Sequence, residues 1–285
     1  MKLLRFGPKG RERPGVLDTD GRIRDFSSIA TDMDARTLAD LQRLRVAAID
    51  NLPIVDPDVR IGAPIAGVGK VICVGLNYSD HARETGQAIP SEPILFLKAT
   101  SSITGPNDDV VLPPGAEKGD WEVELGIVIS REARYVPLAN ALDYVAGACV
   151  VNDVSERSYQ LERGGQWDKG KGCDTFCPLG PYLVTLDEIE RLDDLRMWCT
   201  VNGRTVQDGN TRTMIFDVAY LVHYISQFMS LQPGDVISTG TPPGVGMGMK
   251  PPQWLKEQDI MELGIEGLGT QRQRVVRYNA EAQRD

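Results

Sequence analysis

The pattern of apolar and polar positions in residues 121–129, which read WEVELGIVI, predicts a β-strand. Successive side chains of a strand point to opposite faces, so Glu122 and Glu124 should share one face and Val123 the other. From Gly126 onward the run is apolar without interruption, which indicates a strand that is buried on both faces. The alternative is an amphipathic strand whose glutamates lie in water.

Residues 1–66 predict a small α/β unit that precedes the main body of the chain. Short strands are expected at residues 2–6, 15–17 and 22–25. Apolar residues at near-helical spacing predict a helix over residues 37–49: Leu38, Leu41, Leu44 and Ala48. Prolines at positions 53, 57 and 64 then mark a linker.

The rest of the chain, residues 67–281, predicts a larger domain in which strands outnumber helices. Apolar runs bounded by turn residues predict strands at 70–74, 94–97, 143–151, 198–201, 204–207, 235–238, 259–265 and 271–278. A short helix capped by Ser79 or Asp80 is expected, and a longer helix over residues 217–229. The last seven residues are polar and should be frayed. Many strands with few helices favour a β-rich α+β fold.

Composition and charge narrow the classes of function. A hydrophobic content of 41% and a charged content of 25% are ordinary for a globular protein. The net charge of −9 argues against nucleic acid or an anionic membrane as the main partner. No apolar run approaches the 18 or so residues that span a bilayer, and the charged N-terminal stretch does not resemble a signal peptide. The five cysteines form no CxxC pair, which favours a reducing compartment, by default the cytoplasm.

A third carboxylate extends the chemistry of the glutamate strand. Asp153 follows the apolar strand predicted at residues 143–151. Glu122 and Glu124 would stand about 7 Å apart along their strand, from a rise of roughly 3.3 Å per residue, and could converge with Asp153 on one cation. Buried carboxylates without a partner are too costly to keep, and a cation would remove that cost. An all-oxygen site suits Mg²⁺, Mn²⁺ or Ca²⁺ rather than Zn²⁺. Alternatively, Asp153 emerges into water where its strand ends.

The two histidines differ in their surroundings. His81 is followed three residues later by Glu84, and side chains at this spacing are neighbours on a helix. The carboxylate could orient the imidazole, as a general base for water requires. The alternative is an ordinary helix end in solvent. His223 lies beside the apolar face of the helix predicted at residues 217–229, and we interpret it as structural.

Two irregular segments are candidates for binding substrate. Lys171 lies within residues 162–181, a long stretch rich in glycine and proline, where it could stabilise a developing oxyanion or simply be solvated. Residues 239–246, TGTPPGVG, offer hydroxyl and backbone N–H groups and could bind a substrate carboxylate, or be an ordinary loop. Neither segment has the spacing of a phosphate-binding loop.

Several ordered blocks resemble the fumarylacetoacetate hydrolase family, from about residue 72 to residue 265. The blocks are GLNYSDHARE (75–84), FLKATSSI (96–103), WEVELGIVI (121–129), VNDVSERSYQ (151–160), QWDKGKGCDTFCPLGP (166–181), VNGRTVQDGNT (201–211) and PGDVISTGTPPGVG (233–246). Residues 1–66 match only as the variable N-terminal appendage. The resemblance implies a mixed β-sandwich roll that binds a divalent metal, normally Mg²⁺, and assembles as a homodimer or a higher homo-oligomer.

The resemblance also implies roles for individual residues. Glu122, Glu124 and Asp153 would be the metal ligands. His81 and Glu84 would activate water from a lid that orders when substrate binds. Lys171 would be the active-site lysine, and five residues would contact substrate: Tyr78, Lys98, Arg157, Gln160 and Thr241. Some family members add an aspartate upstream of the histidine to the metal site, and the sequence leaves open whether Asp80 is equivalent.

The reaction implied by the resemblance is the hydrolysis of a C–C bond. Family substrates are typically 2,4-dioxo acids, and attack of water on C4 with cleavage of C3–C4 would release pyruvate. The chain is most similar to the sugar-acid branch, which converts 2,4-didehydro-3-deoxy-L-rhamnonate to pyruvate and L-lactate. The same scaffold hosts acylpyruvate hydrolases, oxaloacetate decarboxylases, ureidoglycolate lyases and hydroxydienedioate isomerases, so fold alone does not settle the reaction. A metal-stabilised binding protein without turnover is the alternative from another class.

Overall fold

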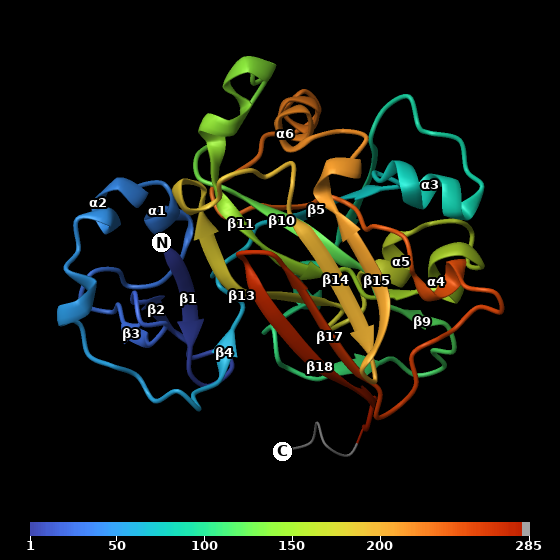
Figure 1. Cartoon of the computed structure of the whole chain (residues 1–285), viewed down its shortest axis with the longest axis horizontal. Coiled ribbons are helices and arrows are strands. Elements are labelled where there is room, and N and C mark those ends of the chain that lie inside the picture. The colour runs from blue at the N-terminus through green and yellow to red at the C-terminus, as the bar shows by residue number, and fades with distance from the viewer. Residues whose placement is uncertain (281–285) are drawn as a thin grey trace.

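Two β-sheets packed face to face form the centre of the molecule, as a computed structural model shows for residues 1–280 (Figure 1). The β-rich α+β fold predicted from the sequence is confirmed, with mixed strand directions in the larger sheet. Of the tail that was predicted to be frayed, residues 281–285 lie outside the described part of the chain. No helix within residues 1–280 is both long enough and apolar enough to cross a membrane.

The larger sheet has 11 strands and runs the length of the molecule. Its main path is β3 (Ile23–Asp25), β2 (Arg13–Leu17), β1 (Lys2–Phe6), β13 (Cys177–Thr185), β11 (Val145–Asn152), β10 (Val123–Ile129), β16 (Val236–Ser238), β5 (Val71–Gly75) and β6 (Ile94–Lys98). Two short strands lie off this path: β4 (Ile61–Gly62) pairs with β1, and β7 (Ile103–Thr104) pairs with β13. The N-terminal strands therefore continue the same sheet, although they lie to one side of the molecule (Figure 1).

The second sheet has five strands and covers one face of the first. Its order is β15 (Arg204–Asn210), β14 (Arg196–Val201), β17 (Ile260–Ile265), β18 (Gly269–Arg277) and β8 (Val110–Leu112). A separate two-stranded ribbon pairs β9 (Gly119–Asp120) with β12 (Ser155–Glu156). A hairpin turn at Asn202-Gly203 joins β14 to β15, and both turn residues have positive φ, as a tight hairpin turn requires.

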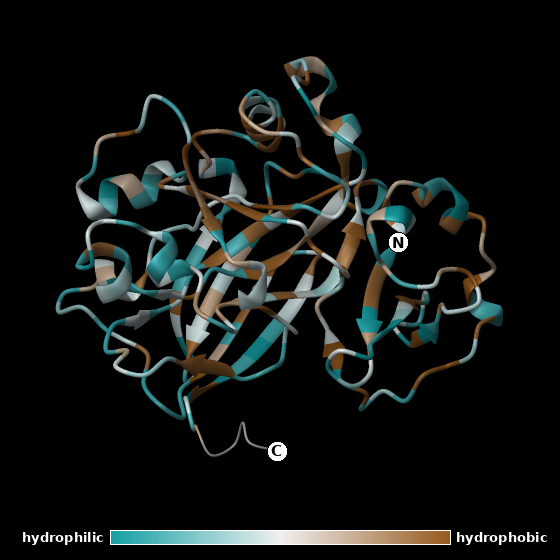
Figure 2. Cartoon of the chain, turned by 180° about the vertical axis from the view of Figure 1, so that it is seen from behind, coloured by the Kyte–Doolittle hydropathy of each residue, from teal (hydrophilic) through white to brown (hydrophobic). Residues whose placement is uncertain are grey.

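Each face of the larger sheet packs against a different apolar layer, which explains why β10 is buried at every position. Leu125 and Ile127 point into the core shared with the five-stranded sheet, together with Met197 and Leu263. Val128 points the other way and packs with residues of the N-terminal unit. Figure 2 shows hydrophobic segments in the central strands, which also carry hydrophilic positions. Glu124 lies on the same side of β10 as Val128, because the two positions have equal parity.

The single helix predicted over residues 37–49 is wrong. The structure has two short helices, α1 (Ala35–Leu38) and α2 (Leu41–Arg45), followed by a turn of 3₁₀-helix. Asp40 between them has φ −132° and ψ 53°, which is not helical. Aspartate competes with the helix through local hydrogen bonds and therefore favours such a break. The apolar spacing was produced by side chains that reach the core from two separate helices.

Three further boundaries differ from the sequence prediction. Strand β10 begins at Val123, so Glu122 lies just before the regular strand. Helix α3 (Ser79–Thr85) takes Tyr78 as its N-cap residue, in place of the expected Ser79 or Asp80. Helix α6 (Val218–Ser226) begins one residue later than the predicted range of residues 217–229, after its N-cap Asp217, and ends three residues earlier. Phe228 therefore lies beyond the helix, where it is 63% exposed and contacts the ring of Tyr224.

Candidate active site

Three carboxylates from two adjacent strands converge at one end of the larger sheet. Glu122 and Glu124 belong to the chain at the start of β10, and Asp153 follows the last residue of β11. Val123 pairs with Asn152 across the two strands, and Asp153 donates its N–H to the carbonyl of Glu122 at 2.9 Å. One oxygen from each carboxylate lies within 4.8 Å of the others, and all three side chains are buried. The geometry matches the metal site expected from the sequence.

Three cations lie directly against these carboxylates. Nζ of Lys171, on α5 (Asp168–Lys171), lies 2.6 Å from Oε2 of Glu122 and 2.8 Å from Oδ2 of Asp153. Nζ of Lys98 lies 2.6 Å from the other oxygen of Asp153. Arg157, the first residue of α4 (Arg157–Leu161), donates to Oε1 of Glu122 at 2.5 Å. Lys171 thus spans two of the three candidate ligands.

The electrostatic surroundings make the two glutamates differ. Burial alone would raise the pKa of Glu122, but the charges of Lys171 and Arg157 outweigh it and hold that pKa at about 2. Among residues 1–280, no cation lies at hydrogen-bond distance from Glu124, which instead accepts from Ser238 Oγ at 2.6 Å and Gly240 N–H at 2.9 Å. Burial, with the charges of Asp153 and Glu122, raises the pKa of Glu124 well above its ordinary value. Without a bound cation, the negative charges of Glu122 and Asp153 therefore favour the protonated form of Glu124.

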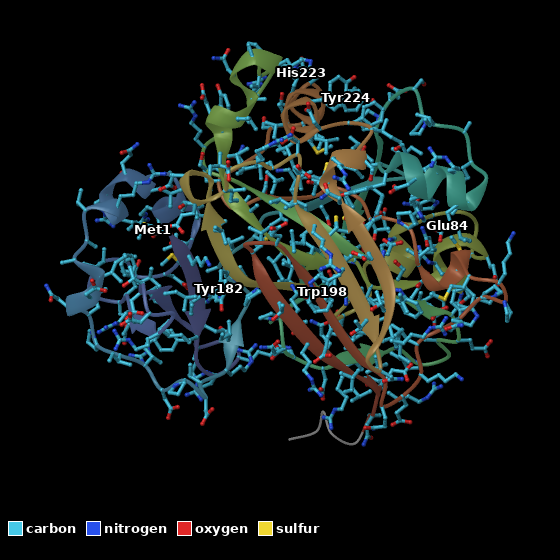
Figure 3. All side chains as sticks on the ribbon, viewed as in Figure 1. Met1, Glu84, Tyr182, Trp198, His223 and Tyr224 are labelled. Carbon is cyan, nitrogen blue, oxygen red and sulfur yellow. The ribbon has the colours of Figure 1, made fainter. Side chains whose placement is uncertain are left out.

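The predicted water-activating pair is formed on α3. Nδ1 of His81 lies 3.1 Å from Oε2 of Glu84, and His81 is only 9% exposed. Both oxygens of Glu84 also accept from the backbone N–H of Gly244, at 3.1 and 3.2 Å. Figure 3 shows Glu84 on the opposite side of the molecule from Met1. The Glu84 carboxylate is thus held between His81 and the loop that follows β16.

This loop binds carboxylates of the chain itself. Gly240 donates to Glu124, and Gly244 donates to Glu84. Gly246 and Met247 both donate to Asp120, at 2.6 and 3.1 Å. Residues 239–246 were predicted to bind a substrate carboxylate or to be an ordinary loop, and the N–H groups of Gly240, Gly244 and Gly246 have internal acceptors instead. We refer to residues 240–247 as the anchoring loop.

The other predicted residues occupy varied positions. Lys98 contacts the carboxylate cluster as described, and Gln160 accepts from Arg157 at 3.0 Å. Thr241 donates to the carbonyl of Val123 at 2.9 Å, which ties the anchoring loop to β10. Tyr78 is fully buried, and its hydroxyl lies 3.2 Å from Sδ of Met197. Contact of these side chains with a substrate stays a prediction.

Two further residues near the site have defined partners. Oδ1 of Asp80 accepts from Thr213 Oγ1 at 3.1 Å and from the N–H of His81 at 3.0 Å. Its partners therefore belong to α3 and to the 3₁₀-helix Thr211–Thr213. The carboxylate group that could hold a metal comprises Glu122, Glu124 and Asp153 and does not include Asp80. Nδ1 of His223 donates to the carbonyl of Val136 at 2.7 Å, which agrees with its structural interpretation.

Comparisons with known proteins give the site its context. The model of the fumarylacetoacetate hydrolase C-terminal domain matches residues 70–276, which is more than half of the chain. The chain belongs to the fumarylacetoacetate hydrolase family. A Burkholderia multivorans protein named as a candidate hydrolase is 58% identical over 96% of this chain and 98% of its own length. The protein is accordingly a hydrolase of the fumarylacetoacetate hydrolase family.

Solved structures of the family superpose over nearly the whole chain. Fumarylacetoacetate hydrolase from Exiguobacterium antarcticum has a TM-score of 0.85 and 37% identity, with 98% of this chain and all of that one covered. Maleylpyruvate hydrolase from Sphingobium sp. SYK-6, in complex with manganese(II) and pyruvate, has a TM-score of 0.82 and 30% identity at the same coverage. The cluster of Glu122, Glu124 and Asp153 fits a divalent metal in this chain too, because its donors are all carboxylate oxygens and lie within 4.8 Å of one another.

Sequence reasoning missed Asp120 as a residue of this site. It is fully buried at the end of β9 and contacts both Arg157 and the anchoring loop. A signal was present, because Asp120, Glu122 and Glu124 alternate with apolar residues at a spacing of two. What could not be read from the sequence was the position of a loop more than 120 residues further along the chain.

Proposed function

We propose that this protein is a metal-dependent hydrolase that cleaves the C3–C4 bond of a 2,4-dioxo acid and releases pyruvate. The observation that carries the proposal is that one segment, the anchoring loop, binds both Glu84 of the water-activating pair and Glu124 of the metal cluster. A base for water and a site for a cation are therefore held in one rigid frame. A protein that only bound its ligand would need no base, so this pairing favours catalysis over binding.

His81 is assigned as the base for the attacking water. Both oxygens of Glu84 accept the N–H of Gly244, and a carboxylate that accepts on both oxygens leaves Nδ1 of His81 to carry the proton between the two side chains. Nε2 is then left with its lone pair and can take a proton from water. Glu84 in turn stabilises the imidazolium that forms, and Gly244 N–H keeps the carboxylate in place. The oxygen that loses its proton then attacks C4, and the C3–C4 bond breaks with its electron pair passing to the pyruvate enolate. The enolate takes up the imidazolium proton at C3, which gives pyruvate and the second acid.

The carboxylates and Lys171 are assigned to the pyruvate end of the substrate. Glu122, Glu124 and Asp153 would hold a divalent cation, for which we propose Mg²⁺, with Mn²⁺ or Ca²⁺ as substitutes. Such a cation would supply electrostatic stabilisation to the negative charge that develops on the 1-carboxylate and 2-oxo group. Lys171, whose pKa is raised by Asp153 and Glu122 despite burial, stays charged and adds a second positive group on the same side.

This arrangement of charges supports a 2,4-dioxo acid as the substrate class. Within the class we propose 2,4-didehydro-3-deoxy-L-rhamnonate as the first compound to test, with pyruvate and L-lactate as products, and acylpyruvates as the next. Maleylpyruvate hydrolase of the same fold was solved with manganese(II) and pyruvate, which supports a pyruvate-releasing reaction. The five cysteines are free thiols, which fits the cytoplasm as the proposed compartment.

Pyruvate release from a panel of 2,4-dioxo acids tests the proposal. The purified protein is incubated with Mg²⁺, with or without chelator, and oxaloacetate serves as the decarboxylation control. We expect chelator-sensitive release of pyruvate from a dioxo acid, and loss of that release in Glu124→Gln. Release from oxaloacetate alone would make the protein a decarboxylase and remove His81 from the mechanism. A spectral change of a hydroxydienedioate without pyruvate would instead indicate an isomerase.

A further inference from the structure

Asp120 accepts four hydrogen bonds although it is neither a candidate metal ligand nor a member of the water-activating pair. Its Oδ1 accepts the N–H groups of Trp121 and Gly246, at 2.9 and 2.6 Å. Its Oδ2 accepts the N–H of Met247 at 3.1 Å and Nε of Arg157 at 2.9 Å. Asp120 is 0% exposed, so these partners replace all contact with water. Each partner is a donor, which requires an acceptor-only carboxylate at this position.

One branch from Asp120 leads to the metal cluster. Arg157 is 4% exposed, and its guanidinium bridges Asp120 and Glu122. The remaining nitrogen, Nη1, donates to Gln160 at 3.0 Å. Because the planar guanidinium holds its donors in a fixed geometry, the position of Oε1 of Glu122 depends on where Asp120 holds the arginine. Asp120 thus orients a candidate ligand that it does not contact.

The other branch leads to the water-activating pair. Asp120 binds Gly246 and Met247 in the anchoring loop, and the adjacent Trp121 donates its indole N–H to the carbonyl of Gly244 at 3.0 Å. The N–H of the same Gly244 is the donor that holds Glu84. A Cβ on Gly246 would lie 2.8 Å from Oδ1 of Asp120, so the loop approaches this carboxylate as closely as only glycine allows.

We propose that Asp120 is a positioning residue that couples the metal cluster to the water-activating pair, through Arg157 on one side and the anchoring loop on the other. The inference rests on the proposed function for the roles of the two groups that Asp120 connects. It assigns Asp120 no contact with substrate or metal. Its loss should therefore weaken metal binding and slow turnover together, as loss of a residue behind a ligand does.

Asp120→Asn is the principal test, because it keeps the size of the side chain and replaces one acceptor oxygen by an N–H donor. Mn²⁺ binding is measured directly by electron paramagnetic resonance, and kcat and KM are measured at saturating Mn²⁺. We expect Mn²⁺ affinity to fall about 10–100-fold and kcat at saturating Mn²⁺ to fall at least about 10-fold, with less change in KM. Mn²⁺ affinity within twofold of wild type, or an unchanged kcat, would overturn the proposal.

Asp18→Asn is the matched control for loss of a buried carboxylate. Asp18 also accepts two backbone N–H groups and the Nε of an arginine, Arg24, but it lies in the N-terminal unit. We expect Asp18→Asn to lower stability and to leave Mn²⁺ affinity and kcat at wild-type values. Equal losses of affinity in both variants would show that Asp120 acts only through general stability, and the proposal would fail.

Two further variants separate the branches and guard against misfolding of Asp120→Asn. Arg157→Lys keeps the charge but cannot bridge Asp120 and Glu122, so Mn²⁺ affinity should fall by a factor similar to that in Asp120→Asn. In a Glu84→Ala background, Asp120→Asn should lower kcat much less than in wild type, with its full effect on Mn²⁺ binding retained. Wild-type Mn²⁺ affinity in Arg157→Lys would contradict the coupling. So would a kcat loss in the double variant that equals the product of the losses in Asp120→Asn and Glu84→Ala.

The outcome is distinguishable from failure of the proposed function. If wild type binds Mn²⁺ but cleaves no dioxo acid, the proposed reaction fails, while weaker Mn²⁺ binding in Asp120→Asn still supports the role of Asp120. If wild type cleaves a dioxo acid and Asp120→Asn matches it in both measurements, only the inference fails. If wild type binds no Mn²⁺, both are overturned.

Discussion

Gly244 donates its backbone N–H to the carboxylate of Glu84, 160 positions away in the chain, at 3.1 and 3.2 Å from the two oxygens. Gly244 has φ +105°, and a Cβ there would lie 1.9 Å from the carbonyl oxygen of Val206. The backbone of this residue therefore lies where it does only because it is glycine. Helix α3 and its histidine depend on this contact.

Gly244→Ala should accordingly lower turnover by about tenfold or more, since general base catalysis contributes about 10²–10⁴ and requires Glu84 in place. Steady-state kinetics at saturating Mg²⁺ measures the change. Gly203→Ala is the matched control, because Gly203 also has positive φ (75°) but a Cβ there would meet nothing within 4 Å. That variant should lose stability only. Equal turnover in the two variants would show that the Glu84 contact is unimportant.

The two histidines of the chain allow a direct comparison. His81→Ala should lower kcat by about 10²–10⁴ and leave Mg²⁺ affinity unchanged, because the imidazole is assigned to water and not to the metal. His223→Ala should keep the wild-type kcat. Its free energy of unfolding should fall by about 1 kcal/mol, the net value of the hydrogen bond from His223 to Val136. Turnover and thermal unfolding are measured for both. A normal kcat in His81→Ala would remove the base from the mechanism.

The raised pKa of Glu124 predicts a pH-dependent stability in the absence of metal. The unfolded chain loses this proton near the ordinary value of 4.5, whereas burial and the charges of Asp153 and Glu122 let the folded chain keep it to higher pH. The unfolded state then binds fewer protons, so the free energy of unfolding falls as pH rises above 4.5, by up to about 1 kcal/mol per pH unit.

Thermal unfolding across pH, without metal, measures this effect. Glu124→Gln cannot titrate, so its stability should fall less steeply with pH than that of wild type. Mg²⁺ binds the ionised carboxylate, so its affinity for wild type should rise with pH and binding should release a proton. Calorimetry in two buffers of different ionisation enthalpy detects that proton. Parallel pH slopes for wild type and Glu124→Gln would show that Glu124 is ionised in the folded chain.

Removal of Lys171 should make the fold depend on metal. In Lys171→Met, Glu122 and Asp153 lose a partner that bonds both of them, and breaking a buried pair costs about 3–5 kcal/mol. A bound divalent cation would restore much of that loss, so Mg²⁺ should raise the unfolding temperature more in this variant than in wild type. Lys70→Met, which breaks the remote ion pair with buried Asp235, should lose stability without rescue by Mg²⁺. An equal Mg²⁺ response in all three proteins would contradict the prediction.

The sequence predicted most strands, because the burial of a strand determines the types of its consecutive side chains. Alternating or continuous apolar residues therefore reveal it. It also placed Glu122, Glu124 and Asp153 at strand ends, where the register of β10 with β11 brings them together. The helix over residues 37–49 was wrong because spacing alone does not reveal whether apolar side chains come from one helix or two. Asp40, whose side chain favours a helix break, was the local signal that the apolar spacing concealed.

The parts of the site that the sequence did not reveal are contacts made by backbone groups. Residues 239–246 were recognised as rich in exposed donors, but the identity of their acceptors depends on tertiary structure. Asp120 and Glu84 are far from the anchoring loop in the chain, and only the folded sheets bring them to it. A loop rich in N–H donors therefore predicts that carboxylates will bind to it. It does not reveal whether these carboxylates belong to a substrate or to the protein itself.

The pairing of β1 with β13 has a practical consequence for anyone who shortens this protein. Leu3 faces Leu183 across that pair, so the first strand of the chain completes the hydrogen bonding of a strand at the centre of the larger sheet. A fragment that starts near residue 67 would leave the edge of β13 open, with N–H and C=O groups ready to pair with another molecule. Such a fragment should aggregate or form oligomers through intermolecular strand pairing. It would do so even though it retains each residue assigned to catalysis.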